Sequence, residues 1–163
     1  MVAQVCHLPV PDDASPADLI RLADQFGKAA DKALRSVKRG DDESRGAFRV
    51  SALRAIDLAL SAALIHNGHS RYAVRAMQAN LHRRAILAAT YHIVLDGQSL
   101  KHLYTLNHDR PYHRSRYDQP VGGNENTDAL AATLRDVLLK VRQCAKAPER
   151  VVSYRPRRPV RAN

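Results

Sequence analysis

The chain has 163 residues, of which 45% are hydrophobic, and a formal net charge of +10. This length and apolar content suffice for one domain with its own core, whereas two distant cysteines, Cys6 and Cys144, support neither a disulfide framework nor a thiolate metal site. No apolar run is long enough to span a membrane, and residues 1–13 lack the basic start and apolar centre of a secretory signal. We therefore expect a cytoplasmic protein.

The apolar residues are mostly alanine, leucine and valine, with no tryptophan and two phenylalanines. Such small side chains favour closely packed helices over a β-sandwich, and the chain shows no strand-like alternation and no internal repeat. We predict an all-α fold in residues 15–148. Residues 1–14 are expected to be a flexible lead-in, and residues 149–163 a basic tail that is either a solvated end or a nucleic-acid arm.

The first helix is predicted to start at Ser15, because a cap hydroxyl is followed by Pro16 at the first helical position and by an acid, Asp18, three residues after the cap. Lys38, Arg39 and Gly40 are predicted to end it. Four further helices are expected, at residues 44–67, 71–95, 99–106 and 127–147. The second is apolar on both flanks and so is predicted to be central, the third is long enough for a bend or break, and Ser99 is the expected cap of the fourth.

Positive charge is concentrated in the later part of the chain. Residues 1–43 carry eight acidic and six basic side chains, whereas residues 44–163 carry eight acidic and twenty basic ones. This imbalance favours a polyanionic partner, either nucleic acid or an acidic protein, although a basic protein without such a partner would have the same composition.

Residues 107–118 stand out because they combine three arginines, two histidines and two tyrosines with no aliphatic side chain apart from a proline ring. Pro111 favours an extended backbone here, and in an extended segment Tyr112, Arg114 and Arg116 point to the same side. Such a row is suited to gripping a phosphate or stacking on a base. We therefore predict Tyr112, Arg114, Arg116 and Tyr117 as nucleic-acid or nucleotide contacts.

The same stretch carries the groups that metal-independent RNA cleavage requires. His113 and His108 titrate near neutral pH and can transfer protons, while Arg110 can hold the phosphate. They are our candidate catalytic residues. In the competing structural interpretation, Arg116 pairs with Asp118 or a helix carboxylate to pin the loop.

No metal or other cofactor is expected. The spacings of His102, His108 and His113 match no common zinc arrangement, and no cysteine or glutamate completes a ligand set. Glycine-rich phosphate loops and nucleophile elbows are also missing. His66, His69 and His82 are expected at helix ends or on the surface, and His92 in the interior.

The order of several motifs resembles the HEPN domain family. These motifs are Asp57-Leu58-Ala59, the turn Asn67-Gly68-His69, Met77-Gln78-Ala79, and Tyr112 followed by Arg116-Tyr117-Asp118 ahead of a last Ala/Leu helix. Many bacterial members carry Tyr and then Arg-Tyr-Pro-Asp in this place. The similarity covers roughly residues 49–145 and places a HEPN-like core at about 44–147.

The resemblance implies an antiparallel, up-and-down bundle of about five helices that forms a homodimer. Family members include metal-independent endoribonucleases, often toxins, as well as nucleotide-binding proteins and partners of small nucleotidyltransferase-like proteins. A small antitoxin or such a nucleotidyltransferase-like protein is therefore an implied partner. Catalytic members have an Arg and a His with four to six residues between them; here Arg75 and His82, with six residues between them, match that spacing outside the usual place, and the proline between Tyr117 and Asp118 is missing.

Three functional hypotheses follow. In the first, the protein binds RNA or a nucleotide through residues 107–118, with or without endoribonuclease activity. In the second, it is a catalytically inactive dimeric interaction module whose loop is structural. In the third, the basic tail alone binds nucleic acid.

Overall fold

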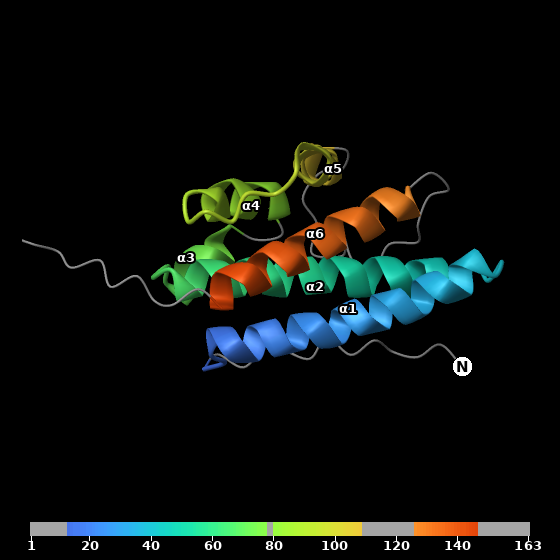
Figure 1. Cartoon of the computed structure of the whole chain (residues 1–163), viewed down its shortest axis with the longest axis horizontal. Helices are drawn as coiled ribbons and strands as arrows, with labels where there is room; N and C mark the ends of the chain where they lie inside the picture. The colour runs from blue at the N-terminus through green and yellow to red at the C-terminus, as the bar shows by residue number, and fades with distance from the viewer. Residues whose placement is uncertain (1–12, 78–79, 109–125, 147–163) are drawn as a thin grey trace, which may run out of the picture.

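The computed structural model describes residues 13–77, 80–108 and 126–146, and all regular secondary structure in these residues is helical (Figure 1). The predicted all-α fold is therefore confirmed for this part of the chain. The helices are α1 (Pro16–Lys38), α2 (Ser44–His66), α3 (Arg71–Ala76), α4 (Leu81–Ala89), α5 (Gly97–His108) and α6 (Thr127–Lys146).

Helix α1 starts as predicted. The Ser15 side chain accepts a hydrogen bond from the Asp18 backbone N–H at 3.1 Å, and the Asp18 carboxylate accepts one from the Ser15 backbone N–H at 3.1 Å. This reciprocal pair satisfies two backbone donors that a helix start would otherwise leave open.

Two glycines end α1 and α2 in the same way. Gly40 and Gly68 adopt positive φ angles of 94° and 92°, a conformation that costs residues with a Cβ atom energy. After each glycine the next backbone N–H reaches back to the last helical turn, from Asp41 to Ser36 and from His69 to Leu64. These Schellman-type turns let α1 fold back onto α2 and let α3 start beside the end of α2.

Helix α2 is the centre of the bundle, which confirms the prediction from its two apolar flanks. It packs mainly against α1 and α6, and it also contacts α4 and α3. In Figure 1, α1 and α6 run along α2, while α5 is seen nearly end-on and so crosses them. The buried side chains of α2 are Phe48, Ala52, Leu53, Ala55, Ile56, Leu58, Ala59, Leu60, Ala62, Ala63 and Leu64.

A buried glycine, Gly27, lies where α1 approaches α6. A Cβ atom added to it would lie 2.9 Å from Cδ1 of Leu138, whereas one added to Gly46 in α2 would have no neighbour within 4 Å. We expect Gly27→Leu to lower the free energy of unfolding by about 1–3 kcal/mol, because the added carbons must displace α6 side chains. Gly46→Leu, the matched control, should not destabilise and should gain up to about 1 kcal/mol of helix propensity. Urea unfolding of both variants checks this; an equally stable Gly27→Leu protein would contradict it.

The third helix predicted over residues 71–95, for which a bend or break was allowed, is not continuous and ends earlier than predicted. The chain forms two short helices there, α3 and α4, followed by a non-helical segment up to Asp96. Asn80 starts α4 by accepting a hydrogen bond from the Arg83 backbone N–H at 2.8 Å. His92, expected in the interior, is exposed and has a φ angle of 65°. In the helix after the break, Arg84 faces α2, where it bonds Asp57 and Ser61.

The start of the fourth predicted helix also differs. Helix α5 begins at Gly97, and Asp96 makes the cap, accepting hydrogen bonds from the Ser99 backbone N–H at 2.8 Å and the Ser99 hydroxyl at 3.0 Å. The Asp136 carboxylate of α6 in turn accepts a bond from the Asp96 backbone N–H at 2.9 Å. Ser99, the expected cap, is buried beneath these contacts.

This cap gives a pH prediction. The hydrogen bond from the Ser99 backbone holds the pKa of the Asp96 carboxyl below its ordinary value of 3.8. A lowered pKa stabilises the fold above the ordinary value, and the contribution disappears as the pH falls through the folded-state pKa. We expect wild type to be more stable than Asp96→Asn at neutral pH and the difference to shrink between about pH 4 and pH 2. Denaturant unfolding across this range tests it; a constant difference would contradict it.

Candidate functional site

Residues of helices α1 to α4 line a pocket of about 440 Å³ that is open to solvent, near the broken segment. Helix α2 forms its inner wall, α3 and the start of α4 form a second wall, and α1 contributes one leucine. The lining residues are Leu19, Arg54, Asp57, Leu58, Ser61, Ile65, Arg71, Val74, Arg75 and Arg84.

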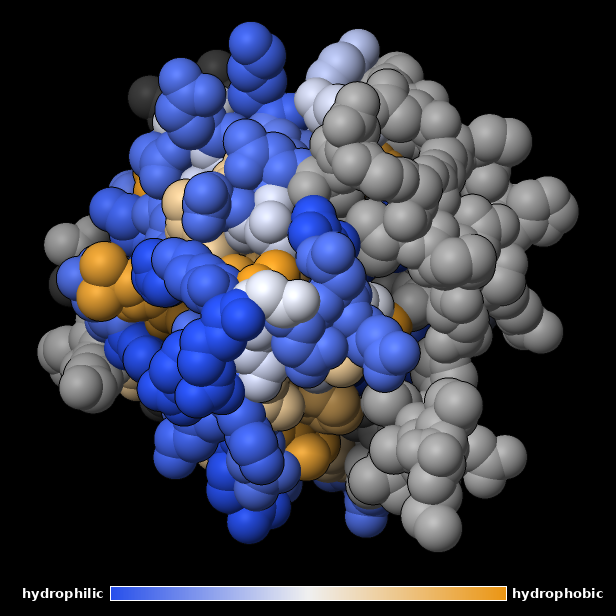
Figure 2. Space-filling model, turned by 90° about the vertical axis from the view of Figure 1, so that its right-hand side faces the viewer, coloured by the Kyte–Doolittle hydropathy of each residue, from blue (hydrophilic) through white to orange (hydrophobic). Residues whose placement is uncertain are grey.

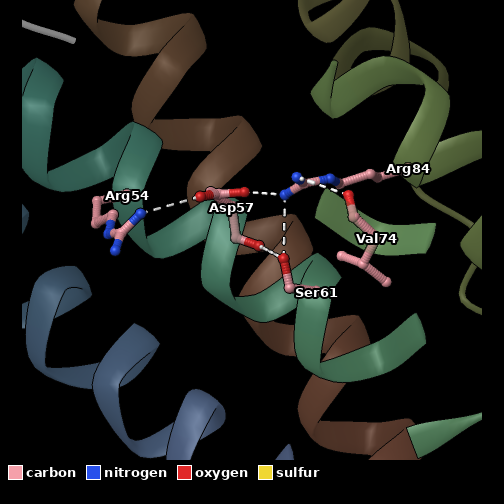
Figure 3. Close-up of polar contacts among 5 residues, drawn as sticks. All are labelled: Arg54, Asp57, Ser61, Val74 and Arg84. Atoms are coloured by element: carbon pink, nitrogen blue, oxygen red, sulfur yellow. Dashed lines mark hydrogen bonds and ion pairs between the residues drawn. The ribbon is translucent and has the colours of Figure 1, made fainter. Parts of the chain in front are cut away.

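Asp57 and Arg84, two residues of the pocket lining, are bonded to each other between α2 and α4 (Figure 3). Nη1 of Arg84 donates to Oδ1 of Asp57 and, at 3.0 Å, to the Ser61 hydroxyl, while Nη2 donates to the Val74 carbonyl oxygen at 3.2 Å. Oδ2 of Asp57 accepts from Nη1 of Arg54 at 3.2 Å. One carboxylate therefore holds two guanidinium groups, and Arg84 ties α4 to both α2 and α3.

Burial makes this network a strong structural constraint. The Arg84 side chain is 6% exposed and that of Asp57 is 15% exposed. A guanidinium group stays charged at any pH a protein tolerates, so this buried charge depends on its partners. Ser61 is itself held by α2, since its hydroxyl donates to the Asp57 carbonyl oxygen at 2.6 Å. The arrangement pins the short helices onto the central one.

The described residues that line the pocket are strongly basic. They include four arginines and one carboxylate, which gives a formal charge of +3. The sequence explains this, because the chain has no acidic residue between Asp57 and Asp96 but carries Arg71, Arg75, Arg83 and Arg84 there. Helices α3 and α4 thus contribute arginines to the pocket lining but no carboxylate.

The two α3 arginines lie on the outer side of the pocket. Arg71 and Arg75 are four residues apart and so share one face of the helix. Arg71 donates to the carbonyl oxygen of Ala14, just before α1, which ties α3 to the start of the chain's first helix. Arg75 is exposed. The charged lining therefore extends from the buried Arg84 out to the surface.

This lining is suited to binding an anion rather than to proton transfer. Guanidinium groups bind phosphate and carboxylate oxygens through paired, charge-assisted hydrogen bonds. None of the described lining residues is a histidine, and the Asp57 carboxylate already accepts bonds from two arginines. The pocket walls supply binding groups, and a general acid or base would have to come from elsewhere in the chain.

The residues predicted as the functional site lie outside the described residues. Arg110, Tyr112, His113, Arg114, Arg116 and Tyr117 fall in residues 109–125, and although His108 is the last residue of α5, its side chain is not described either. The basic tail and the lead-in also fall outside. The pocket is a second candidate, separate from the predicted loop.

The Arg75 and His82 pair does not converge on the pocket. Arg75 is a lining residue, but His82 is not, and its ring packs edge-on against Tyr104 of α5 with the centroids 5.3 Å apart. The break between α3 and α4 separates two residues that one continuous helix would have kept close to a common face.

Two further histidines of the described chain have structural contacts. His102 is hydrogen-bonded through Nδ1 to the Thr133 hydroxyl of α6 at 3.0 Å, and His69 through Nε2 to the Tyr91 hydroxyl at 2.8 Å. In the described part of the chain, no three His, Cys, Asp or Glu side chains are grouped as metal ligands.

Sequence reasoning missed Asp57 as a site residue and Arg84 altogether. A signal was present: Arg84 lies three residues after Leu81 and four before Ala88, on the buried face of α4. An arginine on an apolar stripe needs a buried partner. Asp57 has the matching pattern, an acid between Ile56 and Leu58 on the most buried helix.

The surface gives a further observation. Figure 2 views the end of the bundle where α1 turns into α2, and hydrophilic residues cover most of the coloured surface there, with hydrophobic ones in small separate areas.

No helix in residues 13–77, 80–108 or 126–146 is both long and apolar enough to cross a bilayer.

Comparison of the chain with protein-family models, curated proteins and solved structures gave no match.

Proposed function

We propose that the protein is a HEPN-like helical protein that binds a phosphate-bearing ligand, RNA or a nucleotide. The observation that carries this proposal is the pocket lining, in which four arginines accompany one carboxylate. Guanidinium groups bind phosphate oxygens in bidentate fashion, and an excess of them attracts polyanions before contact. The surplus of basic residues in positions 44–163 also attracts polyanions.

The HEPN-like, up-and-down arrangement and the homodimer are part of this proposal. Support comes from the order of the motifs: Asp57-Leu58-Ala59 lies in α2, Asn67-Gly68-His69 forms the turn after it, and an Ala/Leu helix closes the described chain. Residues 107–118 provide a second set of ligand contacts. In the catalytic form of the proposal, His108 and His113 supply the proton transfer that the pocket lacks, and Arg110 holds the phosphate.

RNA binding by the full chain at several salt concentrations tests the proposal. We expect the logarithm of the association constant to fall linearly with the logarithm of salt concentration, because binding releases counterions from phosphates. Changing His113→Ala together with Arg114→Ala should weaken binding or cleavage without lowering helicity. Arg45→Ala, which removes a surface arginine paired with Asp42 three residues away, is the control. Wild-type protein that binds neither RNA nor nucleotides at low salt would contradict the proposal.

The alternative function is a catalytically inactive dimeric interaction module. Several large apolar side chains of the described helices are exposed, among them Ile86, Tyr104 and Leu139. Light scattering after size exclusion distinguishes the two functions when it is combined with the RNA measurement. A stable dimer without RNA or nucleotide affinity would favour the interaction module.

A further inference from the structure

The arginine-lined pocket differs from a general basic surface in having a fixed interior. Asp57 holds Arg54 on one side and Arg84 on the other, and Ser61 and the Val74 carbonyl oxygen bond Arg84 further (Figure 3). These contacts fix the inner guanidinium groups before any ligand arrives. A site organised in advance loses less conformational freedom on binding.

From this geometry we propose that the pocket binds a phosphomonoester, the terminal phosphate of a nucleotide-sized ligand. Arg71 and Arg75, one helical turn apart on α3, contact the phosphate oxygens from the outer side, and the Arg84 and Asp57 pair belongs to the same lining. A phosphomonoester carries nearly two negative charges at neutral pH and three acceptor oxygens, which matches a lining whose formal charge is +3. Asp57 is a positioning residue in this site.

The apolar part of the lining is small. Leu19, Leu58, Ile65 and Val74 line the same pocket, but Leu19, Leu58 and Val74 are only 2%, 3% and 3% exposed. The half-buried Ile65 is the apolar residue left to contact the rest of the ligand beside the phosphate. A pocket of about 440 Å³ is the size of a small-molecule site and too small for a length of RNA strand.

The inference deepens the proposed function, on which its ligand class rests, by assigning the phosphate to one site. Two ligands carry the required chemistry: a free mononucleotide, or the 5′-phosphate at the end of an RNA chain. The two ligands differ in how much of the molecule enters the pocket. A mononucleotide fits the pocket entirely, whereas an RNA end inserts its phosphate and leaves the chain outside, within reach of other basic residues.

The test is calorimetric titration of the full chain with 5′-AMP, adenosine and inorganic phosphate, and with one short RNA carrying either a 5′-phosphate or a 5′-hydroxyl. We expect 5′-AMP to bind and adenosine to bind at least tenfold more weakly, because charge-assisted hydrogen bonds to the phosphate are lost. Inorganic phosphate should compete with 5′-AMP. A preference for 5′-phosphorylated RNA over free 5′-AMP would identify the RNA end as the source, and the reverse order the free nucleotide.

The variants are chosen so that they leave the buried pair intact. Arg71→Lys keeps the charge but removes the planar fork, and Arg75→Ala removes an exposed guanidinium. Together they should weaken 5′-AMP binding at least tenfold, since each loses charged hydrogen bonds. Arg83→Ala is the matched control, because Arg83 is exposed on α4 in the same acid-free stretch but does not line the pocket. It should change the affinity less than about threefold, as expected for an exposed charge that is screened by solvent and does not line the pocket.

The outcomes separate this inference from the proposed function. The pocket assignment would be overturned if 5′-AMP and adenosine bound with equal affinity. It would also be overturned if Arg83→Ala lost as much 5′-AMP affinity as the double variant. If RNA then still binds, regardless of its 5′ end and of the double variant, the proposed function stands with its contacts elsewhere. Failure of every phosphate-bearing ligand to bind would overturn both.

Discussion

Replacing Asp57 with asparagine is expected to lower the free energy of unfolding by about 3–5 kcal/mol, the range for breaking a buried ion pair from one side. The Arg84 side chain, 6% exposed, would keep its charge and lose its carboxylate, and Arg54 would lose the same partner. For a chain of this size, the midpoint of thermal unfolding should fall by roughly 10 °C. Circular dichroism during heating and urea titration measures both quantities.

Asp24→Asn is the matched control, because it removes another carboxylate that pairs with an arginine of a different helix. Asp24 and Arg142 lie 2.5 Å apart, but their side chains are 33% and 47% exposed, so the cost should stay within about 1 kcal/mol. A double replacement, Asp57→Leu with Arg84→Met, should recover part of the stability lost in Asp57→Asn, since the most buried guanidinium is then removed together with its carboxylate and only the 25% exposed Arg54 loses a partner. Similar costs for Asp57→Asn and Asp24→Asn would show that the pair does not hold α4 in place.

Leu60→Ala should destabilise the protein by about 2–5 kcal/mol, because it opens a cavity on the most buried helix. Leu60 is fully buried, and α1, α4 and α6 all pack on α2, so no single neighbour can move in to fill the space. Urea unfolding measures this effect. A lower midpoint with an unchanged m-value would show that the protein still unfolds in a two-state transition and has lost stability.

The same substitution at Leu139 is the control. Its side chain lies in α6 and is 52% exposed, so Leu139→Ala should change the free energy of unfolding by less than about 0.5 kcal/mol. Equal effects at the two positions would mean that α2 is not the centre of the core.

Local signals predicted much of the fold. The Ser15, Pro16 and Asp18 pattern located the start of α1, the glycines at 40 and 68 located two turns, and the two apolar flanks of α2 identified it as central. Each of these features depends on neighbours within a few residues of the chain, so the sequence displays them directly.

The sequence allowed a bend or break in residues 71–95 but did not locate it between α3 and α4. These residues have helical periodicity, and Arg84 of α4 bonds Asp57, which is 27 residues away, a contact that no local pattern shows. Asn80 is the local part of the signal, since its side chain caps α4, but an asparagine inside a periodic segment does not by itself identify a helix start.

The sequence predicted one candidate site, residues 107–118, where the arginines are adjacent, and that prediction lies outside the described residues. The pocket, a second candidate, was not predicted. It gathers arginines from α2, α3 and α4 that are up to 30 residues apart. Only the packing of these helices brings them together.

An arginine-selective NMR titration with 5′-AMP tests the arginine pocket most directly. The side-chain Nε–H signals of Arg71 and Arg75 should shift in a saturable way, while that of Arg21, paired with Asp18 on the outer face of α1, should not. Shifts spread evenly over surface arginines, with Arg71 and Arg75 no more affected than Arg21, would contradict the assignment of the phosphate to this pocket.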